Sequence, residues 1–281
     1  MKAYPVTVLG KVMRVSRSGF YQYLKRANQG PENNPEETTL KSRTAAIFKE
    51  HRSKYGARRI MKQLNGEGHQ IGIYKVRRMM RDLGLKAKPA KRYKATTDSR
   101  HSFPVAPNVL NREFDVDTPN RAWTADITYV WTLQGWMYLA VVMDLFSRRI
   151  VGWAMDTHMK AQLVIDALAM AYWMRKPDKG LIHHSDRGSQ YACPEYQNGL
   201  KAYGMIPSMN RKGDCWDNAP MERFFRSLKS ERLSDYIFTT RKAAKSEVMD
   251  YISDYNGIRL HSTLGYQSPL ACEKALYRNA A

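Results

Sequence analysis

The sequence has few cysteines, few acidic residues and no long apolar run. Its three cysteines, at positions 193, 215 and 272, include no Cys-x-x-Cys pair, which argues against a disulfide framework or a cysteine-based zinc site. No apolar run reaches the 18 residues of a membrane span, and no signal peptide is recognisable. We therefore expect no membrane partner and a location in a reducing cytoplasm.

The shortage of acidic residues leaves a large positive charge. Forty-six Lys and Arg face 26 Asp and Glu, giving a net charge of +20 and a pI near 9.9. Such a balance indicates a polyanionic partner, although a basic enzyme without one is an alternative. A length of 281 residues with 43% hydrophobic content suggests two domains, or a large domain plus a small one.

The N-terminal third of the chain is predicted to be helical. Within 1–27, apolar stripes over 6–25 predict two short helices, with Ser16 as N-cap of the second. This pair is either part of a helix-turn-helix or a plain helical hairpin. The segment 28–37 is polar and contains two prolines, so we interpret it as a linker.

Residues 38–85 are predicted to form a three-helix, helix-turn-helix DNA-binding domain. Its third helix carries Lys75, Arg78 and Arg81 on one face, as expected of a helix that enters the major groove. A solvated charged face is the alternative. The basic, proline-containing segment 86–110 is expected to be a linker that follows phosphates.

From residue 111 the pattern changes to that of an α/β domain, expected to extend to 275 with a helical C-terminal extension. Three strands form an antiparallel meander, and a helix then leads to a short strand that should pair in parallel beside the first. A further helix, strand and helix complete a mixed five-stranded sheet. The expected strands are 123–131, 136–146, 150–155, 180–185 and 205–209, and the helices are 160–174, 194–203 and a last one from 219.

Three acidic residues are the candidate catalytic and metal-binding groups. Asp126 lies on the first strand, Asp186 at the end of its parallel neighbour and Glu222 on the last helix, and converging carboxylates suit hard divalent cations. The separation of 35 residues between Asp186 and Glu222 is weak evidence by itself, so the weight lies on the flanking residues. On the last helix, Glu222, Arg226 and Lys229 share a face.

Four other polar residues have less specific interpretations. Asp217 or Asn218 can cap the last helix. Asp144 is either a fourth acid near the site or, as we favour, a cap of the turn before Ser147. The adjacent histidines His183 and His184 could suggest a zinc site, but no further ligands lie at a recognisable spacing from them. Neighbours on a strand face opposite ways, so we expect one of these histidines to be buried and the other to lie near the active site.

The segments around the three acids resemble those of an insertion-sequence transposase of the kind encoded by the second reading frame (OrfB type). The resemblance is carried by Trp-Thr-Ala-Asp-Ile-Thr-Tyr, His-Ser-Asp-Arg-Gly-Ser-Gln-Tyr and Asp-Asn-Ala-Pro-Met-Glu, and it covers about the whole chain. It implies a ribonuclease-H-like integrase core preceded by an all-α helix-turn-helix region. The segment from Tyr55 to Ile60, with Arg58 and Arg59, resembles that family's DNA-binding block.

The same resemblance implies a reaction and partners. Asp126, Asp186 and Glu222 would hold two Mg²⁺ ions, with Mn²⁺ as a substitute, for strand cleavage and strand transfer, while Lys229 would contact DNA near the transposon end. The partners would be terminal repeats and target DNA, further copies of the chain on DNA, and the protein of the element's first reading frame, all within the bacterial nucleoid. A non-enzymatic DNA-binding remnant, a ribonuclease H and a structure-specific nuclease are the alternatives.

Overall fold

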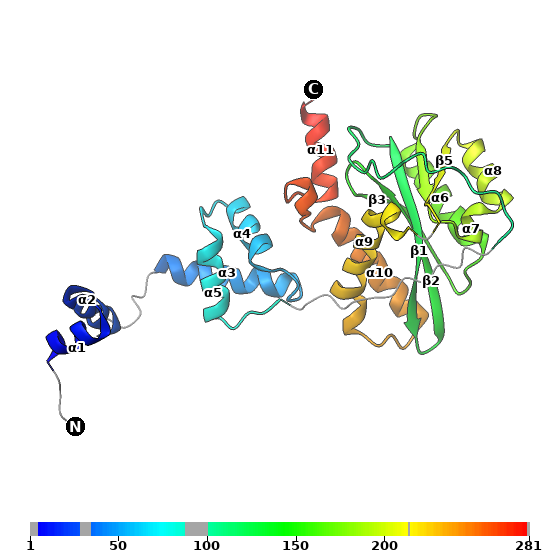
Figure 1. The fold of residues 1–281 in the computed structure, drawn as a ribbon. Helices are drawn as coiled ribbons and strands as arrows, with labels where there is room; N and C mark the ends of the chain where they lie inside the picture. The colour runs from blue at the N-terminus through cyan, green and yellow to red at the C-terminus, as the bar shows by residue number, and fades with distance from the viewer. Residues whose placement is uncertain (1–4, 29–34, 88–100, 213, 280–281) are drawn as a thin grey trace. The chain divides into compact units, whose positions relative to one another are not determined.

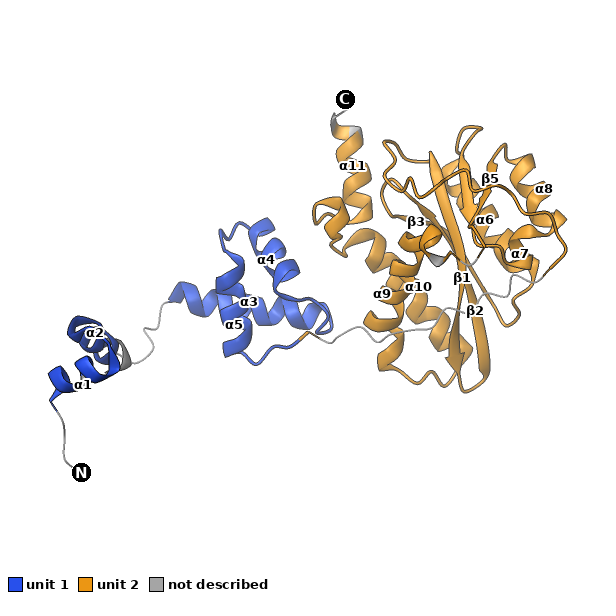
Figure 2. Cartoon of the chain, in the orientation of Figure 1, with its two compact units in different colours: residues 1–86 blue, residues 87–281 orange. Residues whose placement is uncertain are grey.

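The computed structural model describes residues 5–28, 35–87, 101–212 and 214–279. The chain divides into two compact units, residues 1–86 and 87–281 (Figure 2). Most of the expected basic linker, residues 88–100, lies outside the described residues. Among the described helices, none is both long and apolar enough to cross a membrane.

The first unit is entirely helical in its described ranges. Ser16 caps the second helix as expected, because its Oγ accepts a hydrogen bond of 3.1 Å from the backbone N–H of Gly19. Leu40, Ile47, Ile60, Leu64, Val76 and Met79 are buried within the later three-helix group. The helices are α1 (Val6–Met13), α2 (Arg17–Asn28), α3 (Pro35–Glu50), α4 (Ala57–Gly66) and α5 (Ile73–Asp82).

The second unit is built on a mixed five-stranded sheet with the order β3-β2-β1-β4-β5, which confirms the expected fold (Figure 1). β1 pairs antiparallel with β2 along its whole length, from Trp123 opposite Asp144 to Thr132 opposite Gly135, whereas its parallel pairing with β4 covers only Ala122–Thr124. The strands are β1 (Ala122–Thr132), β2 (Gly135–Asp144), β3 (Ile150–Asp156), β4 (Ile182–Ser185) and β5 (Ile206–Met209).

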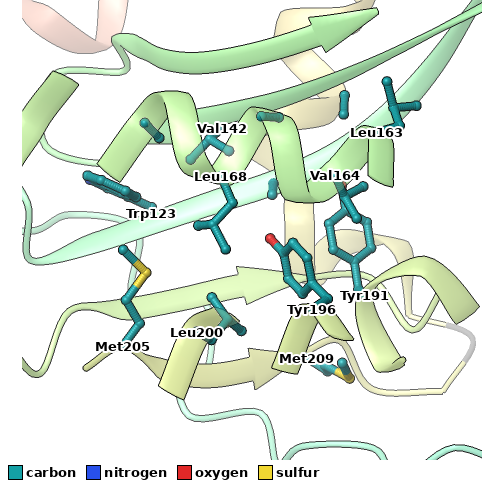
Figure 3. Packing of buried hydrophobic residues seen from close by; sticks show 14 of the residues in the cluster. Trp123, Val142, Leu163, Val164, Leu168, Tyr191, Tyr196, Leu200, Met205 and Met209 are labelled. Atoms are coloured by element: carbon teal, nitrogen blue, oxygen red, sulfur yellow. The ribbon is translucent and has the colours of Figure 1, made fainter. Parts of the chain in front are cut away.

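Helices cover both faces of the sheet because β2 is apolar on both sides. Ala140 and Val142 pack with Trp123 and α6 in one core (Figure 3), while Val141 and Met143 pack in a second core with α9 and α10. The helices of this unit are α6 (Ala161–Arg175), α7 (Ser189–Ala192), α8 (Pro194–Ala202), α9 (Ala219–Glu231), α10 (Arg241–Gly257) and α11 (Pro269–Asn279).

The contact between β3 and α6 allows no side chain at Gly152. A Cβ there would lie 2.3 Å from the carbonyl oxygen of Ala167 and 2.7 Å from the Cβ of Ala171. We expect Gly152→Ala to lower the free energy of unfolding by about 1–3 kcal/mol, measured by urea denaturation. The matched control is Gly199→Ala on α8, where the nearest atom is 4.0 Å away and alanine favours the helix. Equal stability of the two variants would contradict the close approach.

Asp144 caps a turn, as we favoured, and lies in a buried ionic cluster rather than beside the other acids. Its Oδ1 accepts from the backbone N–H of Phe146 and its Oδ2 from that of Asn120, at 2.9 and 2.8 Å. Arg175 pairs with Asp144 and also with Glu273 of α11. The cluster therefore joins the β2–β3 turn to α6 and to the C-terminal helix.

Candidate active site

The parallel pairing of β1 and β4 brings two of the three acids together. Thr124 lies opposite His184 in the register, and Asp126 and Asp186 each follow two residues later, just beyond the last paired residues of the two strands. Each carboxylate is held by a nearby backbone amide: Asp126 Oδ1 accepts from Ile127 at 2.7 Å, and Asp186 Oδ1 accepts from Gly188 at 2.9 Å. Both side chains are thereby oriented just beyond the paired part of the two strands, Asp126 within β1 and Asp186 after the end of β4.

The third acid, Glu222, is brought toward Asp126 by the buried side-chain amide of Asn218, at the start of α9. Asn218 accepts a hydrogen bond of 2.5 Å from Thr124 Oγ1, and its Nδ2 donates one of 3.1 Å to the carbonyl oxygen of Ala125. Those two residues directly precede Asp126. Glu222 lies one turn after Asn218, so the same side chain sets the position of the helix relative to the strand.

The charges of both other acids act on Asp126. Burial raises the pKa of Asp126 well above its ordinary value, and the charges of Asp186 and then Glu222 raise it further. The Ile127 amide and the Lys229 ammonium act in the opposite direction. Burial also raises the pKa of Glu222, with Arg226 opposing it. Repulsion among three carboxylates is the condition that a bound cation relieves.

The donor set fits a hard divalent cation in its chemistry. All three groups offer carboxylate oxygens, which are the ligands that Mg²⁺ and Mn²⁺ prefer. Over the described parts of the chain, no three His, Cys, Asp or Glu side chains are gathered closely enough to hold a metal ion as a group. The charge of Asp186 affects the pKa of Asp126 more than the charge of Glu222 does.

Lys229 lies two turns beyond Glu222 on α9 and is linked electrostatically to Asp126. Its Nζ lies 4.5 Å from the centre of the Tyr129 ring, which places the ammonium on the aromatic face. Burial lowers the pKa of Lys229, and the charge of Asp126 raises it. Arg226, between Glu222 and Lys229 on the helix, is exposed. Phe225 and Leu228 face the core, as the helical pattern predicts.

The expected cap of α9 is right in position for Asn218 and wrong in its hydrogen bond. Asn218 occupies the N-cap position, but its side chain makes no capping hydrogen bond because it is used by Thr124 and Ala125. Asp217 accepts instead from Arg211, Arg112 and Asn108. Burial would raise the pKa of Asp217, but the hydrogen bonds from these arginines outweigh it and hold the pKa well below its usual range.

Both histidines are buried, so the expected burial of one is confirmed and extends to the other, and the expected position of one near the active site stays a prediction. His183 Nε2 lies 3.2 Å from the Tyr196 hydroxyl, and burial, with a smaller effect of His184, lowers the pKa of His183 to about 3. His184 hydrogen-bonds Ser208 and Asn210, each at 2.8 Å. Each histidine is therefore held inside the fold by polar side chains from other elements.

In the first unit, the predicted basic face is present on α5 and is partly balanced by an acid. Arg78 and Arg81 are exposed and Lys75 is partly exposed. Arg78 Nη2 lies 3.1 Å from Glu37 Oε2 on α3, and a hydrogen bond from Lys41, together with the charges of Arg78 and Lys75, lowers the pKa of Glu37. On α4, Arg58 is exposed, whereas the guanidinium of Arg59 lies 5.1 Å from the centre of the Tyr55 ring.

Two known domain families match this chain. The Integrase core domain matches residues 116–215 and 203–269, and the HTH-like domain matches residues 35–93. The first range contains Asp126 and Asp186, and the second contains Glu222 and Lys229. The HTH-like range contains all of α3, α4 and α5.

Two curated relatives match nearly the whole chain. The "Insertion element IS600 uncharacterized 31 kDa protein" of Shigella sonnei is 42% identical over 272 residues, covering 96% of this chain and 99% of the relative. The "Transposase InsF for insertion sequence IS3A" of Escherichia coli (strain K12) is 39% identical over 267 residues, covering 95% and 93%.

Among solved structures, a chain of the simian T-cell lymphotropic virus intasome in complex with PP2A regulatory subunit B56 gamma matches with a TM-score of 0.50. The match covers 82% of this chain and 74% of that chain, at 15% sequence identity. A likeness at this identity concerns the fold alone. It agrees with the mixed five-stranded sheet and its covering helices.

Proposed function

Because this chain belongs to the insertion-sequence transposases, and so acts in DNA transposition and integration, we propose that Asp126, Asp186 and Glu222 are its catalytic carboxylates. The observation that carries the proposal is geometric: the parallel β1–β4 pairing sets Asp126 and Asp186 on neighbouring strands, and Asn218 fixes the start of the Glu222 helix against the two residues that precede Asp126. Three acids from two strands and a helix thus lie close enough to interact in a chain of net charge +20.

In this proposal, the three carboxylates would bind Mg²⁺ or Mn²⁺, with two ions at each site. Such ions would lower the pKa of the attacking water or 3′-hydroxyl and stabilise the leaving oxygen of an in-line displacement. The chain's own residues position the reactants. Asn218 holds the Glu222 helix against β1, and Lys229 and Arg226 place cationic groups along the same helix face, where they would hold the DNA backbone.

Strand cleavage on DNA that carries the element's end tests this function. The full-length protein should nick that DNA at the element boundary when Mg²⁺ or Mn²⁺ is added, and should join the released 3′-hydroxyl to a second DNA. A chelator should stop both steps and leave binding in place. Equal cleavage in chelator would contradict the metal-dependent mechanism, and binding without any cleavage would favour a non-enzymatic role.

We further propose that α5 carries the main DNA contacts of the first unit through Lys75, Arg78 and Arg81, with Arg58 and Arg59 on α4 as additional contacts. The ion pair between Arg78 and Glu37 is exposed, so exchanging Glu37 for a phosphate costs little. Phosphate binding would then release counterions and make the affinity depend steeply on salt.

The paired substitutions Arg78→Ala and Glu37→Gln should change DNA affinity in opposite directions. Arg78→Ala should weaken binding and reduce the slope of log affinity against log salt by about one, since one phosphate contact is lost. Glu37→Gln should strengthen binding because it removes an internal competitor for Arg78. Lys49→Ala, at an exposed lysine near the end of α3, is the control. Salt titrations by fluorescence anisotropy measure all three, and identical slopes for Arg78→Ala and the control would refute the assignment.

We also propose that the chain works on DNA as a homo-oligomer, and together with the first-reading-frame protein where the element encodes one. The proposal rests on the family resemblance. Sedimentation with and without end-containing DNA, and with the partner added, tests both associations.

A further inference from the structure

An aromatic cluster on the β1–β2 hairpin lies exposed beside the candidate active site. Tyr129 and Trp131 on β1 and Trp136 on β2 are 37%, 52% and 45% exposed. They contact one another edge to face, with ring centres 5.1 Å apart for Tyr129 and Trp136 and 4.7 Å apart for Trp131 and Trp136. Large aromatic side chains usually contribute to a core or to an interface, so their exposure here requires an explanation.

The hairpin carries these rings beyond the part of the sheet that is covered by β4. β4 pairs with β1 only as far as Thr124, while the hairpin continues to the turn before Gly135. Tyr129, Trp131 and Trp136 belong to neither of the two buried cores of the sheet. We call this set of three residues the aromatic cluster.

Two cationic side chains lie at the ends of the aromatic cluster. Lys229 lies two turns beyond Glu222 on α9, and its Nζ lies 4.5 Å from the centre of the Tyr129 ring. At the other end, Arg241 Nη2 lies 3.1 Å from the point where a Cβ on Gly135 would stand, next to Trp136. The cluster is therefore continuous with the candidate active site through Lys229.

We propose that the aromatic cluster binds an unpaired nucleobase of the DNA strand being processed, with Lys229 and Arg241 holding the adjoining phosphates. Nucleobases stack on exposed aromatic rings, and the strand's phosphates need cations nearby; this surface offers both. A second copy of the chain is a poorer occupant, because it carries the same net charge of +20 and would bring like charges toward Lys229 and Arg241.

The base must be unpaired because both of its faces are covered by neighbours in a stacked duplex. The proposal rests on the proposed function in one respect: cleavage at an element end supplies a strand whose terminal bases can open. Tyr129 and Trp131 project from the opposite face of β1 to Asp126, so a strand that stacks on Trp131 would reach Asp126 by passing Lys229, which contacts Tyr129. The aromatic cluster would thus hold the end of the strand open and fix its position relative to the carboxylates.

Binding measured without catalysis tests this proposal separately from the proposed function. The full-length Asp126→Asn protein in chelator is titrated with a short fluorescent single-stranded oligonucleotide and with a duplex of the same length. Trp131→Ala, added to this background, should weaken single-strand binding by about five- to a hundredfold, the range that one stacked base corresponds to. Its duplex affinity should not change. Trp131→Phe, which keeps a ring, should lose less.

The matched control is Trp173→Ala on α6, where the tryptophan is 65% exposed and belongs to a different helix. It should bind both DNAs as the parent does. A second probe avoids dependence on any variant's folding: an abasic oligonucleotide with the same phosphates should bind the parent as weakly as the normal oligonucleotide binds Trp131→Ala.

Three results would overturn the proposal. The first is equal single-strand affinity for Trp131→Ala and Trp173→Ala. The second is equal affinity of the parent for the normal and abasic strands. The third is a loss of self-association in sedimentation with no change in DNA affinity, which would make this surface a protein interface. Failure of strand cleavage by the wild type, with single-strand discrimination intact, would refute the proposed function and leave this inference standing.

Discussion

Asp126→Asn should abolish strand cleavage and, in the absence of metal, raise the melting temperature of the protein. Burial and the neighbouring charges of Asp186 and Glu222 raise the folded-state pKa of Asp126. A carboxyl whose pKa is raised on folding contributes stability below its unfolded pKa, and that stability is lost as the pH rises through the folded value. As the pH rises above the ordinary carboxyl pKa, the wild-type side chain therefore destabilises the fold relative to the amide, which does not titrate.

The measurement is a series of thermal melts in chelator from acid to neutral pH. Wild type should lose stability over the window between the ordinary carboxyl pKa and the raised value, and Asp126→Asn should lose less. The control is Asp166→Asn, at an exposed aspartate on α6. If Asp126→Asn melted at the same temperature as wild type at every pH, folding would not raise the pKa of Asp126, and the interaction among the three acids would be refuted.

In the cleavage assay, Asp126→Asn, Asp186→Asn and Glu222→Gln should each lower the rate by about a thousandfold or more. The estimate follows from losing several kcal/mol of charge stabilisation at 1.36 kcal/mol per decade. DNA binding should survive. Lys229→Ala should lower the rate by only about ten- to a hundredfold, since one charged contact is lost. Wild-type cleavage by any of the three acid variants would remove that residue from the catalytic set.

The sheet, and the placement of Asp126 and Asp186 on neighbouring strands, could be predicted from sequence because their signals are local. Apolar residues on both faces of 136–146 indicated an interior strand, and β2 lies between β1 and β3. A helix between two strands indicated parallel pairing, and β4 is parallel to β1. Asp126 and Asp186 therefore had to lie on adjacent parallel strands, each two residues beyond a paired position.

The predicted capping hydrogen bonds of α9 were wrong because each polar side chain had a distant partner as well as a local one. Asn218 and Asp217 are good caps by type, but they bind partners more than 90 residues earlier in the chain, Thr124 and Arg112. Burial of both histidines follows from the Tyr196 and Ser208 contacts, which come from other elements. The motif Asp-Asn-Ala-Pro-Met-Glu marked the right segment, but sequence spacing alone does not reveal which of its side chains reaches across to β1.

Asn218→Ala should leave the protein folded and able to bind DNA but lower its cleavage rate by at least about tenfold. The substitution leaves the Ala125 carbonyl and the Thr124 hydroxyl without their buried partner, at a cost of about 1–3 kcal/mol. Glu222 would then lose the anchor that sets its helix against Asp126. Because Asn218 is buried beneath α9, the loss should fall on kcat, with KM for DNA near wild type.

Matched variants separate this positioning role from general destabilisation. Thr124→Ser keeps the hydroxyl that donates to Asn218 and should retain most activity, whereas Thr124→Val keeps the shape, loses the donor and should act like a milder Asn218→Ala. Asn198→Ala, at an exposed asparagine on α8, should be neutral. Single-turnover cleavage rates and melting temperatures are measured for all of them.

If Thr124→Val and Thr124→Ser cleaved at the same rate, the hydrogen bond from Thr124 would have no part in positioning Glu222. If Asn218→Ala lost activity only in proportion to its lost stability, Asn218 would serve the fold and not the geometry of the site.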